Sequence, residues 1–186
     1  MAALLASLVA AFLCAWGDRT QFLAATLAAG TRKPGQVLAG LVLAVAASNA
    51  AAAYAGAWIA ASINLRASSL LTALALLFAG ISGLIPRKPQ PERAPRLLLL
   101  SVYILILATE MGDRIQFLTF AFAGRFGTAP LAAAGATIGL VAACVPAVVL
   151  GDELQAKVPL RGLRWAVAGV MLVAGFIIGV NALQLT

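Results

Sequence analysis

Long apolar stretches alternate with short polar segments along the whole chain, and six of the stretches are long enough to form membrane-crossing helices. They lie at residues 2–29, 36–61, 67–85, 97–124, 130–151 and 163–183. A helix needs about 20 mostly apolar residues to cross the hydrocarbon core of a bilayer. The pattern therefore predicts an all-α polytopic membrane protein with six transmembrane helices in the lipid bilayer. The first and fourth stretches are the longest, and we expect their helices to be tilted, kinked or broken.

Both of these long stretches carry charged residues near their middle. The first contains Gly17-Asp18-Arg19-Thr20 and the fourth contains Gly112-Asp113-Arg114-Ile115, each followed by Gln-Phe-Leu. Charges at mid-membrane depth are costly and persist mainly where they serve transport, proton relay or pairing. The two motifs are therefore the strongest functional signal in the sequence.

The two motifs are 95 residues apart, and the same shift aligns other parts of the chain, such as Gly40 with Gly135 and Leu65-Arg66 with Leu160-Arg161. This indicates an internal repeat with three spans in each copy. Because three is odd, the second copy must enter the membrane from the opposite side, which is typical of secondary transporters. The sequence thus predicts a 3+3 inverted repeat, with residues 1–85 and 97–186 as three-helix repeats and 86–96 as a cytoplasmic linker.

Composition and loop charges define the setting. The chain of 186 residues is 63% hydrophobic and 10% charged, so a separate soluble domain is excluded. Loops after the odd-numbered spans and their boundaries carry nine cations, against two after the second and fourth spans. The positive-inside rule places the odd loops in the cytoplasm and both termini outside it. The short loops fit a bacterial inner membrane. The net charge of +7 follows from this loop pattern, so nucleic acid is not an expected partner.

Oxygen-bearing side chains cluster around the motifs. If the helix is continuous, Glu110 and Asp113 share one face, and Asp18 faces them from the other repeat. Gln21 and Gln116 follow each Asp by three residues and can act as ligands or orient the carboxylates. Oxygen-only donor sets suit hard divalent cations, and buried carboxylates also take up protons. Competition between a metal ion and protons for the same carboxylates is the physical basis of cation/proton exchange. Gly17 and Gly112 allow the helices to distort at this point.

Three further residues have alternative interpretations. Arg19 and Arg114 are expected to pair across the repeats or to extend toward the interface, rather than to bind the cation. A purely structural set of ion pairs is the alternative, but it leaves Glu110 and the glutamines unexplained. Asn49, near the middle of the second span, is either a hydrogen-bonding link between helices or a cation ligand.

The pair of motifs resembles that of the Gdt-type Ca²⁺/Mn²⁺:H⁺ exchangers, which carry two copies of Glu-x-Gly-Asp-(Lys/Arg)-(Ser/Thr) in the first and fourth of six spans. The resemblance covers essentially the whole chain. It implies a secondary transporter that exports Mn²⁺ or Ca²⁺ as substrate in exchange for protons, with no permanently bound cofactor. Two residues depart from the family pattern: Ala15 stands in place of the first Glu, and Ile115 stands in place of the second Ser/Thr. The site therefore has three acidic residues rather than four.

Other functional classes are weaker. A transporter of a small organic solute could use a similar scaffold, and Trp16 and Met111 beside the motifs are its only support. A non-transporting subunit with a decayed site would explain Ala15 and Ile115, and a second copy or a related subunit is a candidate partner. An enzyme is not expected, because the chain has no His, no nucleophile–base pair and no phosphate-binding loop.

Overall fold

The computed structural model describes residues 1–85, 98–150 and 160–183, and within these ranges every regular element is an α-helix. The expected linker at 86–96 and the end of the fifth expected span lie outside the described residues. The helices in these ranges are α1 (Ala2–Ala15), α2 (Arg19–Thr31), α3 (Pro34–Ala60), α4 (Leu65–Leu84), α5 (Leu98–Glu110), α6 (Arg114–Phe126), α7 (Ala129–Leu150) and α9 (Leu160–Leu183).

Length and composition of the described helices confirm a multi-span membrane protein but not all six expected spans. By length and composition, four helices qualify in the described part of the chain, namely α3, α4, α7 and α9. The pair α1–α2 qualifies as a fifth span that is bent by 63° at its break. The stretch 97–124, whose helix was expected to be tilted, kinked or broken, is divided into α5 and α6, and α5 is a short apolar helix.

Each break is a three-residue segment centred on a glycine. Gly17 and Gly112 adopt positive φ values of 69° and 76°, which side chains with a Cβ rarely tolerate. The residue after each glycine, Asp18 or Asp113, is the extended N-cap of the following helix. An Asp at this position is a strong helix start. The Gly-Asp pair therefore ends one helix and begins the next, which confirms the expected distortion at the glycines.

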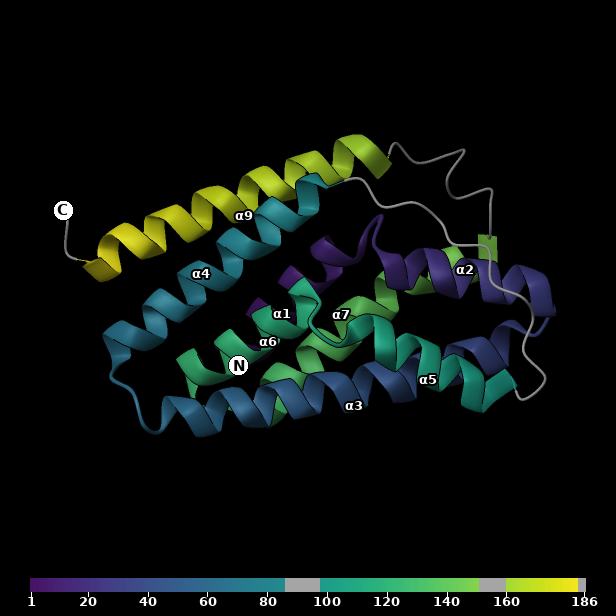
Figure 1. Ribbon diagram of the computed structural model, residues 1–186, viewed down its shortest axis with the longest axis horizontal. Helices are drawn as coiled ribbons and strands as arrows, with labels where there is room; N and C mark the ends of the chain where they lie inside the picture. Colours follow the sequence, from purple (N-terminus) through teal and green to yellow (C-terminus); the bar gives the residue numbers. More distant parts are fainter. Residues whose placement is uncertain (86–97, 151–159, 184–186) are drawn as a thin grey trace.

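The helix starts recur at the spacing found in the sequence. Helices α2, α3 and α4 begin at Arg19, Pro34 and Leu65, and α6, α7 and α9 begin 95 residues later in each case. The packing shows the same correspondence between the two halves of the chain. Helices α1 and α2 contact α7, and their counterparts α5 and α6 contact α3. Helices α4 and α9 lie side by side along one edge of the molecule (Figure 1). Each half of the chain therefore packs mainly on helices of the other half.

Small residues allow this packing to be close. Gly135 and Gly139 of α7 face the backbone carbonyls of Leu4 and Leu8 in α1, and a Cβ at either glycine would collide with them. Spacing of small residues by four positions permits such an approach between membrane helices. The spacing of these two glycines therefore allows α1 and α7 to pack closely.

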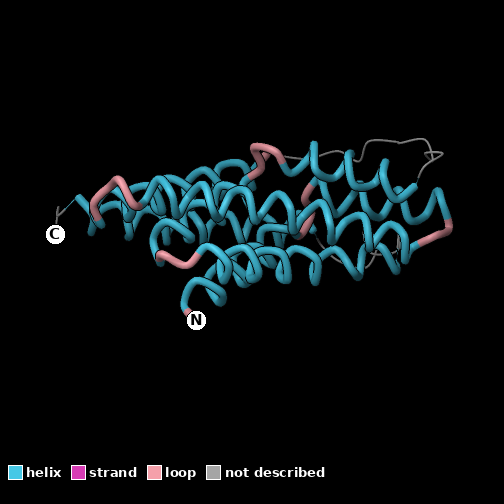
Figure 2. The backbone as a smooth tube through the Cα atoms, turned by 90° about the horizontal axis from the view of Figure 1, so that it is seen from below, coloured by secondary structure: helices cyan, strands magenta, loops and turns pink. Residues whose placement is uncertain are grey.

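The bundle is elongated (Figure 2). Its exposed surface carries many large apolar side chains. Large apolar side chains are exposed on several helices, including Trp58, Leu65, Val149 and Phe176. A surface of this kind is suited to lipid rather than to water. The first residue, the turn between α3 and α4, and the C-terminal end of α9 all lie toward the left of Figure 1, whereas the turn between α2 and α3 lies at the right.

Candidate cation site

The two broken helices bring all three expected acids into the protein interior. Asp18, Glu110 and Asp113 are 1%, 0% and 8% exposed, respectively. Glu110 is the last residue of α5, and Asp113 caps α6. A shared face for these two residues requires a continuous helix, and the helix is broken between them. The left-handed turn at Gly112 separates them, although both remain buried near the same break.

Glu110 is held from the other half of the chain. Its Oε1 accepts a hydrogen bond from the Thr20 hydroxyl on α2 at 2.5 Å. Its Oε2 is buried and has no hydrogen-bond partner among the described residues. A buried carboxylate oxygen without a donor is costly unless a proton or a cation occupies it. Glu110 therefore has one oxygen fixed by the protein and one oxygen available to a ligand.

Arg114 links the two motifs. Its Nη2 lies 3.3 Å from Oδ1 of Asp18, and both side chains are almost fully buried. The same nitrogen donates to the backbone carbonyl of Cys14 at the end of α1. Arg19, which occupies the equivalent position in the first motif, is exposed. Of the two arginines expected to pair across the repeats, Arg114 does so, and its charge compensates that of Asp18.

Asp113 is oriented by its position at the start of a helix. Its Oδ2 accepts a hydrogen bond from the backbone N–H of Ile115 at 3.2 Å. An aspartate at this position caps the helix and is held in one orientation by the backbone. The carboxyl group of Asp113 is thus pre-oriented at the start of α6. Glu110 interacts electrostatically with both Asp113 and Asp18.

The two glutamines play matching roles at the two breaks. The side-chain oxygen of Gln21 accepts from the Gly17 N–H at 2.8 Å, and that of Gln116 accepts from the Gly112 N–H at 2.7 Å. Their amide nitrogens donate to the opposite half of the chain. Gln21 donates to the Ala143 carbonyl at 2.8 Å, and Gln116 donates to the Ser48 hydroxyl at 3.1 Å. The glutamines therefore stabilise each break and tie it to the facing helix.

Asn49 is the centre of a second polar group, which the sequence pattern did not reveal. It is fully buried, its Oδ1 accepts from Thr119 at 3.2 Å, and its Nδ2 contacts Thr137 Oγ1 at 3.4 Å. These contacts tie α3 to α6 and α7, so the structure places Asn49 as a link between helices. Ser48, Thr119 and Thr137 were missed, although polar side chains inside apolar spans were an available signal.

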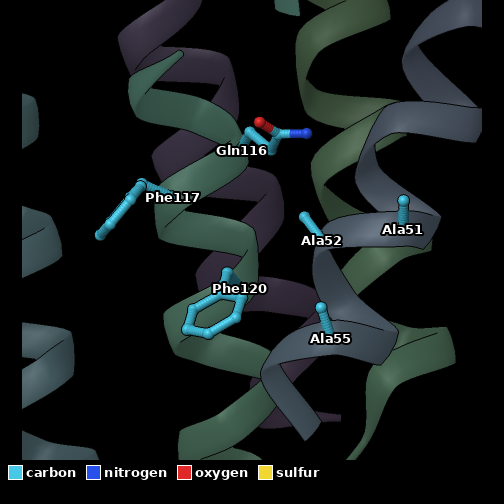
Figure 3. Close-up of a pocket in the computed structure, with 6 residues that line it drawn as sticks. All are labelled: Ala51, Ala52, Ala55, Gln116, Phe117 and Phe120. Atoms are coloured by element: carbon cyan, nitrogen blue, oxygen red, sulfur yellow. The ribbon is translucent and has the colours of Figure 1, made fainter. Parts of the chain in front are cut away.

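The arrangement is not a preformed multi-acid metal cage. Within residues 1–85, 98–150 and 160–183, no group of three or more His, Cys, Asp or Glu side chains lies close enough to hold one metal ion. A pocket of about 300 Å³ opens between α3 and α6 beside Gln116 (Figure 3). Its other lining residues are alanines of α3 and phenylalanines of α6. Because it is lined by no carboxylate, this pocket differs from the acidic site.

Apolar membrane helices, two of them broken at buried charged residues, define a multi-pass membrane transport protein. The chain belongs to the divalent cation/proton antiporter GDT1 family, whose model matches residues 3–91 and 98–185. A protein of Vibrio cholerae serotype O1, named "Putative manganese exporter", is 31% identical over 177 residues, which cover 92% of this chain and 88% of that protein. No solved structure matches the chain significantly. The family match confirms the resemblance that the two motifs indicated. Members of this family are transporters and not enzymes, as expected.

Proposed function

We propose that this protein exports Mn²⁺, with Ca²⁺ as the alternative cargo, in exchange for protons that flow inward. Glu110 carries the proposal, because it is completely buried, one of its oxygens is fixed by Thr20, and the other has no hydrogen-bond donor among the described residues. Protonation or cation binding at that oxygen removes the cost of the missing donor. The two events exclude each other, which is the coupling that an exchanger requires.

The charges around Glu110 favour a divalent ion. Asp113 and Asp18 both interact electrostatically with Glu110, and Arg114 pairs with Asp18, so three carboxylates and one guanidinium lie around the proposed cation position. Carboxylate oxygens are ligands that Mn²⁺ and Ca²⁺ accept, and amide or backbone oxygens at the breaks can complete the coordination. The manganese name of the Vibrio cholerae relative favours Mn²⁺ as the first ion to test.

We further propose that the chain is a 3+3 inverted repeat, with residues 1–85 and 97–186 as the repeats and 86–96 as the cytoplasmic linker. The recurrence of helix starts after 95 residues and the two segments matched by the family model support it. In this arrangement α1–α2 and α5–α6 are the first spans of the two repeats. Both termini then lie on the extracytoplasmic side of a bacterial inner membrane. In support, the first residue and the end of α9 lie on the same side as the α3–α4 turn (Figure 1).

In the proposed cycle, the cation enters from the cytoplasm and displaces protons from Glu110 and Asp113. A shift of one half of the bundle against the other then exposes the site to the opposite side, where protons replace the cation. Gly17 and Gly112 are suited to act as hinges, because their left-handed backbone interrupts the two helices at the site. The ion pair between Arg114 and Asp18 holds the halves together near the carboxylates.

The experiment compares wild type and Glu110→Gln in proteoliposomes that carry a pH-sensitive dye, with Mn²⁺, Ca²⁺ and Mg²⁺ as driving ions. Glutamine retains an oxygen that can accept from Thr20 but cannot exchange a proton. We expect a Mn²⁺-driven proton flux in the wild type and its loss in Glu110→Gln. The matched control is Thr26→Val, which removes a hydroxyl bonded only to the Phe22 carbonyl of its own helix and leaves the site unchanged. Equal flux in wild type and Glu110→Gln would refute the role of Glu110.

A further inference from the structure

The hydrogen bond between Thr20 and Glu110 has an apolar counterpart elsewhere in the same protein. Adding 95 to Thr20 gives Ile115, and subtracting 95 from Glu110 gives Ala15. The two places where the chain departs from a symmetric pair of motifs are therefore the two partners of a single contact. At the first pair of positions, the Thr20 hydroxyl donates a hydrogen bond to the Glu110 carboxylate. At the pair related by 95 residues, the side chains are those of Ile115 and Ala15.

The same relation holds for the neighbouring polar contacts. The bond between Thr119 and Asn49 corresponds to Ala24 and Cys144 at a shift of 95. The bond from Gln116 to the Ser48 hydroxyl corresponds to Gln21 and Ala143, where only the backbone carbonyl remains as acceptor. These two polar contacts join α6 to α3, and their counterparts lie between α2 and α7. They are therefore on the helix that carries Ile115 and not on the helix that carries Thr20.

The apolar counterparts are well packed. Ala15, Ala24, Ile115, Ala143 and Cys144 all belong to the main buried hydrophobic cluster, and each is buried. Ala15 and Ile115 are each 1% exposed, and their helices, α1 and α6, pack against each other. Ala15 and Ile115 are therefore packed among apolar side chains, whereas Ala24, Ala143 and Cys144 belong to α2 and α7, on the side of Thr20.

We propose that the chain contains two half-sites at positions related by the 95-residue shift, and that it binds its cation at only one of them. The polar half-site is centred on Thr20 and Glu110, and the apolar half-site is centred on Ile115 and Ala15. Ala15 and Ile115 are then specificity-determining residues, because together they remove the second half-site. This inference rests on the proposed function for the identity of the ligand but not for the pairing of the positions.

A polar pair at positions 15 and 115 is favourable only when both residues are polar. A glutamate at position 15 that faces Ile115 would bury a carboxylate without its hydroxyl donor. A threonine at position 115 that faces Ala15 would bury a hydroxyl at the expense of apolar packing. When both are present, each satisfies the other, as Thr20 and Glu110 do.

A stability cycle without metal tests the pairing. We expect Ala15→Glu and Ile115→Thr each to lower the melting temperature of the detergent-solubilised protein, and the double variant to recover at least part of the summed loss. The control combines Ala15→Glu with Ile106→Thr, which alters a fully buried isoleucine of the same cluster outside the half-site. In this control, the losses of melting temperature caused by the two substitutions should add. Additive losses in the Ala15→Glu/Ile115→Thr variant would overturn the inference.

A transplantation experiment tests the binding role by Mn²⁺ titration calorimetry. The variant Thr20→Ile/Glu110→Ala exchanges the polar half-site for the apolar pair and should lose Mn²⁺ binding. Adding Ala15→Glu and Ile115→Thr to it should restore binding to within about tenfold of the wild-type Kd. The Asn49–Thr119 contact lies on α6 with the transplanted pair and not on α2, so the surroundings of the two pairs are not identical. The control replaces Ala15→Glu by Ala15→Gln, which has the same size without the charge, and should not restore binding.

The results separate the two proposals. If the wild type binds Mn²⁺ and the fourfold variant folds without regaining it, the equivalence of the half-sites is wrong and the proposed function stands. If the wild type does not bind Mn²⁺ while the stability cycle shows coupling, the proposed cargo is wrong and the pairing stands. Recovery in the fourfold variant together with coupling in the cycle would support both.

Discussion

Arg114 on α6 forms a buried ion pair with Asp18 at the start of α2, with 3.3 Å between Nη2 and Oδ1. The contact joins residues that are 96 positions apart in the sequence and belong to different motifs. It also affects the charge of the site, because the Arg114 guanidinium compensates the carboxylate of Asp18. Glu110, by contrast, keeps one buried oxygen that has no hydrogen-bond partner among the described residues.

Arg114→Gln should destabilise the protein strongly. The change leaves Asp18 in the interior without its compensating cation, and breaking a buried pair in this way costs about 3–5 kcal/mol. The matched control is Arg19→Gln, because Arg19 occupies the equivalent position but is exposed. Thermal unfolding in detergent should show a much larger loss for Arg114→Gln. Equal losses in the two variants would mean that the ion pair contributes little to the fold.

Asp113→Asn should keep the fold and lose coupled exchange. Asparagine is as good an N-cap as aspartate, so the start of α6 is preserved. It cannot carry the negative charge, so both cation attraction and proton release at this position disappear. Mn²⁺-driven proton flux in proteoliposomes should fall to the protein-free background while the melting temperature stays near that of the wild type. A variant that exchanges at the wild-type rate would remove Asp113 from the site.

The apolar periodicity and the duplicated Gly-Asp motif were sufficient to predict an all-helical membrane protein and the distortion of its helices at Gly17 and Gly112. They were not sufficient to predict how the acids are arranged. Glu110 and Asp113 are three residues apart, which suggests one helix face, but the positive φ of Gly112 places them on different elements. Sequence spacing translates into a shared face only where the helix is continuous.

The sequence also could not predict which residues pair with the buried polar side chains. Glu110 is bonded to Thr20 and Asn49 to Thr119, across 90 and 70 residues respectively. Such contacts depend on how the halves pack, and no local pattern specifies them. Arg114 was predicted to pair across the repeats, but nothing in the sequence distinguished it from Arg19, which is exposed.

Gly139→Ala should weaken the contact between α7 and α1. A Cβ at this position would meet the Leu8 carbonyl, which belongs to the backbone and cannot move without a shift of the helix. Overpacking of this kind typically costs about 1–3 kcal/mol. Gly30→Ala is the control, because nothing lies within 4 Å of the point that its Cβ would occupy. The melting temperature should fall for Gly139→Ala and remain nearly constant for Gly30→Ala; similar values would refute the close approach of α1 and α7.

Substitutions of Gly112 should separate backbone strain from steric effects at the break. Nothing lies within 4 Å of a Cβ at Gly112, so only its φ of 76° opposes a side chain. Alanine in the left-handed region costs roughly 1–2 kcal/mol, whereas asparagine visits this region more readily. We therefore expect Gly112→Ala to lower both the melting temperature and the Mn²⁺-driven flux, and Gly112→Asn to lower them less. Gly169→Ala, in open space on α9 and without a positive φ, should leave stability unchanged or slightly raised. If Gly112→Ala behaved like Gly169→Ala, the left-handed break between α5 and α6 would not be needed for the fold or for transport.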